Sequence, residues 1–490
     1  SKETHNYTLT AWIDESYILP IKNETTTTKE TNQETYKFKV KVVGVDSPIT
    51  IEEKAASLDT SGANAPLLAS NMIPVYYDET AETWKKADAS NGNSNYQWYS
   101  YESSGDKKGM WANAVTVTET NRTAYLNAEP GTIIPMKDIN TMWIWIPRFK
   151  VNTTDFDAIS GECKCSNSST TKEECINNHG AWICPNPGAI DVTFVKQNET
   201  AIDAFTFGTK QLSGFWYGKF EIGGTLPNAC KTEKCYVSKI VVKPNVSSLK
   251  KQTVSSFFYA ARSMEQTGNS FGFVSSEVDT HMSKNNEWGA VAYLTQSIYG
   301  RCISSTSCTE VYSNNSSGYY TGRSGGSAGK TPINGTYTDQ TSTTEYNTYG
   351  FYTYDDYLLN YNTNTKGKKA NGKGTGASTT GTIYGIYDMS GGSWEYVMGV
   401  YNKTISYSGF SSLPDSKYYN NYTSSAYTGH ALTEVSYWYS DGAGFIYTSE
   451  PWFRRGGGYG LRASAGVFYF STCIGGSSSD YSSRLVISNE

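Results

Sequence analysis

The chain has 490 residues and a formal net charge of −5, and only 18% of its residues are charged. This mild acidity excludes the basic footprint of a nucleic-acid-binding protein, and the short apolar runs exclude a membrane-spanning helix. Its 39 Tyr and 45 Gly accompany many Ser, Asn and Thr residues. That composition is typical of recognition surfaces, in which Tyr supplies rigid contact area and small polar residues adapt.

Residues 1–58 are expected to form a small β module or stalk. Segments 7–13 and 36–43 alternate apolar and polar side chains, as half-buried strands do. The Gly, Ala and Pro residues of 61–66 mark a boundary. The remainder, 66–490, is expected to form one larger domain.

This larger domain is expected to be rich in strands and loops. Three segments of β-branched and aromatic residues, at 73–77, 111–118 and 142–151, predict short strands. Residues 312–381 are mostly Gly, Ser, Thr, Asn, Tyr and Lys, which predicts a long surface loop. Together these patterns indicate an α+β domain in which strands and irregular loops dominate.

Few helices are predicted. Two segments place apolar side chains at helical spacing and predict helices over 255–266 and 285–297. Trp288 belongs to the apolar face of the second helix, and Ser283 or Asn285 is placed to cap its N-terminus.

Eight of the nine cysteines lie close to another cysteine in the sequence. They are Cys163, Cys165, Cys175, Cys184, Cys230, Cys235, Cys302 and Cys308. Such short loops favour disulfides formed in an oxidising compartment, which predicts an extracellular or cell-surface protein. The alternative for the first four is a zinc site completed by His179. Cys473 has no sequence neighbour with which to pair.

The most informative segment is 381–397, which reads GTIYGIYDMSGGSWEYV. Its pattern predicts a strand, a glycine-rich turn and a second strand that buries Trp394. The segment also resembles the GxYDMSGNxWEW signature of the formylglycine-generating-enzyme family, a branch of the C-type lectin fold. Residues 286–294 resemble that family's EWEYAA helix, and 455–457 and 484–487 resemble its RGGS and GFR segments, in the same order.

This resemblance covers about residues 66–490, with insertions near 155–190 and 310–380. It implies a C-type lectin-like fold of the formylglycine-generating-enzyme subtype. The final segment, 455–487, is similar to the variable region of proteins encoded by diversity-generating retroelements. In those systems an error-prone reverse transcriptase mutates adenines of a template that is copied into the end of the gene.

The missing residue types in this segment agree with that similarity. Between Arg455 and Ser488 the chain has no Lys, Glu, Gln, Met or Trp. Randomising the first two bases of an AAC-type codon cannot produce these five residues, whereas it can produce the lone Cys473. The alternatives are a Gly- and Ser-rich terminal loop without diversification and, for Cys473, an intermolecular disulfide.

The resemblance to retroelement variable proteins implies a ligand-binding face of varied side chains on a fixed scaffold. The expected face comprises Gly458, Tyr459, Gly460, Leu461, Arg462, Ser464, Tyr469, Ser471, Thr472, Cys473, Ile474, Ser477, Ser478, Asp480, Tyr481 and Ser482. The expected scaffold comprises Trp288, Asp388, Trp394, Arg455, Gly456, Gly457, Phe468 and Arg484. Because Tyr and Arg are common binding hot spots, the expected anchors are Tyr459, Arg462, Tyr469 and Tyr481.

No catalytic residue and no cofactor is predicted. The formylglycine-generating enzymes use paired cysteines near the C-terminal part of the domain, where this chain has only Cys473. Gly392 stands in place of the family's Asn, which removes an amide from its calcium site, although Glu395 remains. The four histidines show no metal spacing, and each is expected to make an ordinary polar contact. They are His5, His179, His281 and His430.

The sequence therefore predicts a secreted or surface-displayed bacterial or phage protein that binds a protein or glycan on another surface. We expect no nucleic-acid partner, and contact with a membrane only through a removed or separate anchor. One alternative is a filament or pilin-like subunit, in which residues 1–50 pair with neighbouring copies by strand addition. A second alternative is a formylglycine-generating-type oxidase that acts through Cys473.

Overall fold

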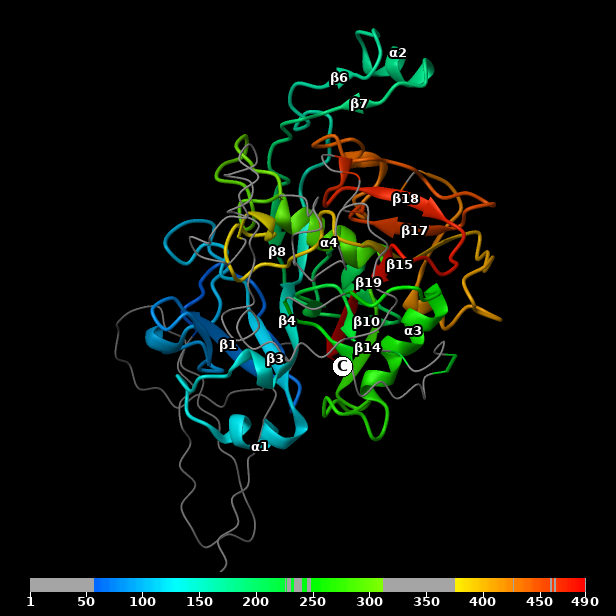
Figure 1. Cartoon of the computed structure of the whole chain (residues 1–490). Coiled ribbons are helices and arrows are strands. Elements are labelled where there is room, and N and C mark those ends of the chain that lie inside the picture. Colours follow the sequence, from blue (N-terminus) through cyan, green and yellow to red (C-terminus); the bar gives the residue numbers. More distant parts are fainter. Residues whose placement is uncertain are drawn as a thin grey trace, which may run out of the picture. The chain divides into compact units, whose positions relative to one another are not determined.

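The computed structural model describes residues 57–224, 226, 231–232, 240–244, 248–311, 375–425, 427–458, 461 and 464–489 (Figure 1). The chain separates into two units, Ser1–Glu53 and Lys54–Glu490, and every described residue belongs to the second. The predicted β module lies outside the described residues, apart from residues 57 and 58. The predicted surface loop also lies outside them, apart from 375–381.

Seven antiparallel strands form the larger sheet (Figure 1). In spatial order they are β14 (Val278–Met282), β20 (Leu485–Asn489), β11 (Gly214–Gly218), β4 (Ile139–Pro147), β3 (Asn113–Val117), β1 (Ile73–Asp78) and β2 (Thr83–Lys86). The predicted strands at 73–77, 111–118 and 142–151 are confirmed as β1, β3 and β4. The last is interrupted at Arg148 and continues as β5 (Phe149–Val151).

Both faces of this sheet are covered, as β4 illustrates. Its residues Trp143, Ile144, Trp145 and Ile146 alternate between the two faces, and all four are fully buried. Trp145 meets Trp216 of β11 edge to face, with 5.3 Å between the ring centroids. A strand buried on both faces requires a continuous apolar run, which is what this segment supplies.

A second sheet carries most of the C-terminal part of the chain. Its strands lie in the order β16 (Asn420–Tyr422), β15 (Trp394–Tyr401), β17 (Trp452–Arg455) and β18 (Phe470–Cys473), and β19 (Tyr481–Ser483) also pairs with β15. Arg484 alone separates β19 from β20. The chain therefore passes directly from this sheet into the interior of the larger one, where β20 lies between β14 and β11.

Both predicted helices are confirmed. They are α3 (Val254–Arg262), which a 3₁₀ turn prolongs, and α4 (Asn285–Thr295). The predicted cap of α4 is wrong, because the N-cap residue is Lys284. The backbone N–H of Lys284 donates to Oε2 of Glu287 at 2.7 Å, so a side chain in the first turn of the helix satisfies this N–H group.

The other elements are short. They are α1 (Glu119–Asn127), α2 (Lys172–Asn177), β6 (Lys164–Cys165), β7 (Trp182–Ile183), β8 (Val192–Phe194), β9 (Thr206–Phe207), β10 (Lys210–Gln211), β12 (Gly223–Gly224), β13 (Ile240–Val241), and 3₁₀ turns at Ser94–Tyr96, Met136–Asp138, Asp203–Phe205, Ser263–Glu265, Thr375–Ala377, Ser416–Tyr418 and Thr433–Val435. The described residues thus form a loop-rich, strand-rich α+β structure with few helices, as predicted. Within these residues, no helix has both the length and the apolar character that crossing a bilayer requires.

The glycine-rich segment 381–397 agrees only in part with its prediction. Its second half includes the start of β15, but its first seven residues form turns and not a strand. The reason is Lys219, whose buried ammonium donates to the carbonyls of Ile383 and Gly385 at 2.6 and 3.0 Å. These carbonyls therefore bond to a side chain and not to the N–H groups of a neighbouring strand. Gly391 then turns the chain towards β15 with a φ of 76°, which glycine adopts without strain.

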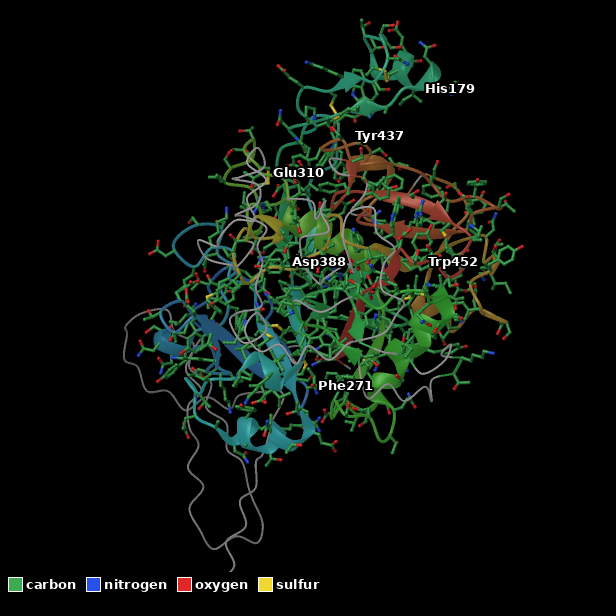
Figure 2. The ribbon with its side chains drawn as sticks, in the orientation of Figure 1. His179, Phe271, Glu310, Asp388, Tyr437 and Trp452 are labelled. Atoms are coloured by element: carbon green, nitrogen blue, oxygen red, sulfur yellow. A yellow bond between two sulfur atoms is a disulfide. The ribbon has the colours of Figure 1, made fainter. Side chains whose placement is uncertain are left out.

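Three disulfides link six of the predicted cysteines, as Cys163–Cys184, Cys165–Cys175 and Cys302–Cys308. The first cluster is therefore paired internally, and the zinc alternative is wrong because a disulfide leaves no thiolate for a metal. His179 lies exposed beside α2 at the edge of this cluster (Figure 2). Cys230 and Cys235 lie outside the described residues. Disulfides of this kind form in an oxidising compartment.

Candidate binding face

The second sheet presents a group of aromatic and cationic side chains that are partly exposed. Trp394 opens β15, Arg454 lies in β17 and Tyr481 opens β19. The register pairs Trp394 with Tyr481, and it pairs Arg454 with Tyr396, two residues further along β15. Because side chains two apart on a strand share a face, these residues lie on one face of the sheet. We call Trp394, Arg454 and Tyr481 the aromatic–arginine cluster.

The guanidinium of Arg454 packs against both rings of the cluster. Its central carbon lies 3.6 Å from the ring centroid of Trp394 and 5.2 Å from that of Tyr481, and Nη1 donates to the Tyr481 hydroxyl. Burial, against the opposing effect of Arg454, raises the pKa of Tyr481 to about 12, so the phenol keeps its proton. A cation stacked on Trp and Tyr is oriented in advance for a ligand, which reduces the entropy lost on binding.

More deeply buried aromatic side chains support the cluster. The ring of Tyr469 meets Trp394 edge to face at 5.1 Å, and Tyr396 meets Tyr481 in the same way at 5.1 Å. The Tyr396 hydroxyl also lies 3.1 Å from Sγ of Cys473. The thiol of Cys473 is therefore packed in this layer, and an intermolecular disulfide would require the layer to open.

The structure exposes part of the predicted face and buries the rest. The positions that are at least partly exposed are Leu461, Ser464, Ser471, Thr472, Ile474, Ser477, Ser478, Asp480 and Tyr481. The buried positions, which correct the expectation of projecting side chains, are Gly458, Tyr469, Cys473 and Ser482. Tyr459, Gly460 and Arg462 lie outside the described residues. Of the two predicted anchors that are described, Tyr481 reaches the surface and Tyr469 does not.

Gly458 has a physical reason to be glycine. A Cβ atom added there would lie 2.2 Å from Nε1 of Trp394, a distance at which one of the two must move. Neighbouring Gly457 has a φ of 72°, and a Cβ atom on it would lie 2.8 Å from that of Ala465. The backbone of these glycines therefore lies directly against the cluster and the following loop.

The predicted scaffold residues are buried with one exception. Those that are buried are Trp288, Asp388 (Figure 2), Arg455, Gly456, Gly457, Phe468 and Arg484. Arg455 illustrates their role, because its Nη2 donates to the carbonyl of Ala431 at 2.8 Å and its guanidinium lies 5.8 Å from the Trp288 ring. The exception is Trp394, which was expected to be buried but is partly exposed, with its ring against the guanidinium of Arg454.

Glu395 and Arg484 form a fully buried, two-bonded ion pair. Arg484 Nε lies 3.0 Å from Oε2 of Glu395, and Nη2 lies 2.6 Å from Oε1. Both carboxylate oxygens of Glu395 are thus occupied, and Gly392 has no side-chain oxygen, so these residues do not fit a calcium site. Among the described residues, no group of three or more His, Cys, Asp and Glu side chains is arranged to hold a metal ion.

The buried histidines make polar contacts, as predicted. Nε2 of His281 lies 3.0 Å from Glu287, and Nδ1 lies 3.3 Å from Asp279. Burial lowers the pKa of His281, but the two carboxylates outweigh burial and raise it above its ordinary value. His430 is bonded to a carboxylate and to a tyrosine. His5 lies outside the described residues.

A buried carboxyl group holds the loop that leads into β18. Asp441 is 1% exposed, and its Oδ2 accepts a hydrogen bond from the N–H of Phe468 at 3.0 Å. Burial raises the pKa of Asp441 well above its usual range, and the charge of Glu310 (Figure 2) raises it further. The folded protein therefore favours the protonated acid.

Replacing Asp441 with Asn is expected to stabilise the protein by about 1–2 kcal/mol at pH 8, and by less at pH 5. A pKa that is raised in the folded state stabilises the protein at low pH, and this stability is lost as the pH rises through the raised value. Asn does not titrate, so the variant does not lose stability in this way. Thermal unfolding at the two pH values measures this. The exposed control, Asp106→Asn, should show no pH-dependent gain, and an equal effect of Asp441→Asn at both pH values would contradict the argument.

No protein-family profile matches the chain, and no curated protein matches it.

Sequence reasoning missed Arg454 and assigned Trp394 to the scaffold, although both belong to the cluster. The detectable signal was the order of residues 452–455, WFRR, in which one Arg must face the core and the other the opposite side of the strand.

Proposed function

We propose that the chain is a secreted or surface-displayed recognition protein that binds a protein or glycan ligand at the aromatic–arginine cluster. The observation that carries this proposal is the stacking of Arg454 on Trp394 at 3.6 Å, with Tyr481 bonded to the same guanidinium. Trp, Tyr and Arg are the residues that most often dominate binding energy, particularly where supporting contacts fix them in advance. The three disulfides agree with display outside the cytoplasm.

In this proposal the domain has a C-type lectin-like fold, and exposed positions around the cluster vary between copies of the gene. Ser471, Ile474 and Ser477 lie on or beside the cluster's strands and are at least partly exposed, so their side chains can change without disturbing the core. Sequencing this gene in one bacterial population tests the idea. Substitutions concentrated at exposed codons between 461 and 481 support it, and a uniform sequence in this region would remove its basis.

Arg454→Ala is expected to weaken ligand binding at least 30-fold, because truncating a hot-spot residue costs about 2 kcal/mol or more. The measurement is biolayer interferometry of the full chain against a printed glycan panel and immobilised bacterial cells. Lys107→Ala is the matched control, since it removes the same charge from an exposed position. Binding that Arg454→Ala leaves unchanged would place the ligand elsewhere.

An enzymatic role has less support from the same region. Among the described cysteines, only Cys473 is not part of a disulfide, and it is buried against Tyr396. A cysteine-dependent oxidase needs a reactive thiol that substrate can reach. Turnover of a cysteine-containing peptide that Cys473→Ser abolishes would favour the enzyme over the recognition protein.

A further inference from the structure

A second candidate site lies in a cavity of about 540 Å³ that shares no lining residue with the aromatic–arginine cluster. Loops that follow β5 and β16 line it, together with α4 and the 3₁₀ turn at Asp203–Phe205. Its volume is within the range of sites for small molecules or single side chains. The lining combines aromatic rings with one carboxylate, from Phe156, Tyr293, Tyr427, Asp203 and His430.

A chain of hydrogen bonds holds the carboxylate in place. Asn285 Nδ2 donates to the Tyr422 hydroxyl at 2.6 Å, the hydroxyl lies 2.6 Å from His430 Nδ1, and His430 Nε2 lies 2.8 Å from Asp203 Oδ2. A hydroxyl that accepts from Asn285 directs its own hydrogen to Nδ1 of His430. The other ring nitrogen of His430, Nε2, then faces the carboxylate of Asp203. The chain of hydrogen bonds therefore fixes the orientation of the carboxylate.

Asp203 remains accessible, because 54% of its side chain is exposed while His430 is buried behind it. Burial raises the pKa of Asp203, but the hydrogen bonds and the charges around it outweigh burial and lower it below its ordinary value. Asp203 is therefore ionised at neutral pH. No Lys or Arg side chain lines the cavity.

Of the two tyrosines in the lining, Tyr427 is partly exposed, whereas Tyr293 is fully buried and its hydroxyl is already hydrogen-bonded. Tyr293 donates to Glu434 and accepts from the N–H groups of Gly429 and Ala431. The Tyr293 ring also stacks on Phe156, with 5.9 Å between centroids. The partly exposed rings of Phe156 and Tyr427 offer aromatic faces that attract a cation.

We propose that this cavity binds an organic cation, an ammonium or guanidinium group carried by a small amine or by a lysine or arginine side chain. The positive group would pair with Asp203, and the attached methylene groups would lie against the rings of Phe156 and Tyr427. This site is independent of the proposed binding face, so an experiment can contradict one of the two proposals and leave the other standing.

Isothermal titration of the full chain with butylamine, butylguanidine and a Gly-Lys-Gly peptide tests the proposal, with methyl glucoside as the neutral probe. Saturable binding of the cations is expected, weakened at least tenfold by Asp203→Asn and unaffected by the exposed control Asp106→Asn. Tighter binding of the peptide than of butylamine would indicate a polypeptide source for the cation, and equal binding a free amine.

A second variant, Phe156→Leu, keeps the carboxylate but removes an aromatic face, and it is expected to weaken cation binding severalfold. Thermal unfolding of both variants verifies that they are folded. Cation binding that Asp203→Asn leaves unchanged, binding of methyl glucoside alone, or no binding of any cation by the folded wild-type chain would each overturn the proposal.

Discussion

Replacing Arg484 with Met is expected to lower the free energy of unfolding by about 3–5 kcal/mol, the usual cost of leaving one member of a buried ion pair without its partner. Glu395 and Arg484 are both fully buried, and two hydrogen bonds join them. Arg484 also donates to the carbonyl of Gly218 at 2.9 Å. Its loss would therefore weaken the connection between the two sheets at three points.

The loss should grow with pH. Burial raises the pKa of Glu395 even with Arg484 beside it, and removing Arg484 raises it further. Keeping the buried acid protonated then costs more free energy at pH 9 than at pH 6, because the same group in the unfolded chain is ionised at both pH values. Urea unfolding at both pH values measures the difference. The double variant Arg484→Met with Glu395→Leu is expected to recover most of the stability, because an apolar pair leaves no buried charge. A double variant less stable than Arg484→Met would contradict this explanation.

Gly458→Leu is expected to destabilise the protein by about 1–3 kcal/mol, as overpacking of a filled site does, and to abolish ligand binding at the cluster. A side chain at this position must displace the indole of Trp394, because even its Cβ atom would lie 2.2 Å from Nε1. Moving the indole removes the surface on which Arg454 stacks. Urea unfolding and biolayer interferometry on the same preparation measure the two effects.

Ser477→Leu provides the matched control, since Ser477 is exposed and belongs to the same predicted face. It is expected to leave stability within about 0.5 kcal/mol of wild type. Equal tolerance of leucine at both positions would show that Trp394 can be displaced without cost. The comparison also bears on diversification, because a varied population should retain glycine at 458 while changing at 477.

Local patterns predicted the elements whose stability comes from their own residues. The apolar run of β4 and the helical spacing around Trp288 correspond to a strand and a helix in the structure. The short spacing of Cys302 and Cys308 correctly indicated a disulfide. In each case the contacts that decide the structure follow from residues close together in the chain.

Residues distant in sequence determined what local patterns missed. Residues 381–387 contain strand-forming side chains, but distant groups bond to their carbonyls and hold them as turns. The ammonium of Lys219 bonds to Ile383 and Gly385, and the amide of Asn113 bonds to Tyr384. Arg454 and Trp394 are 60 positions apart, and only the pairing of β15 with β17 brings them together. The sequence predicted that Gly458 varies. The contact that requires glycine there is made by the same distant Trp394, so the local sequence could not reveal it.

The position of β20 has a consequence for how errors in this gene are filtered. This strand follows the predicted variable positions in the chain, yet it lies between β14 and β11 inside the larger sheet. If the segment is diversified as proposed, a frameshift or premature stop within it would alter or remove β20, which would leave β14 without its partner strand and one edge of β11 unpaired. Unpaired strands of this kind prevent a stable core. Under the proposed diversification, a copy would have to be read in frame through this segment in order to fold, so folding itself would remove defective copies before display.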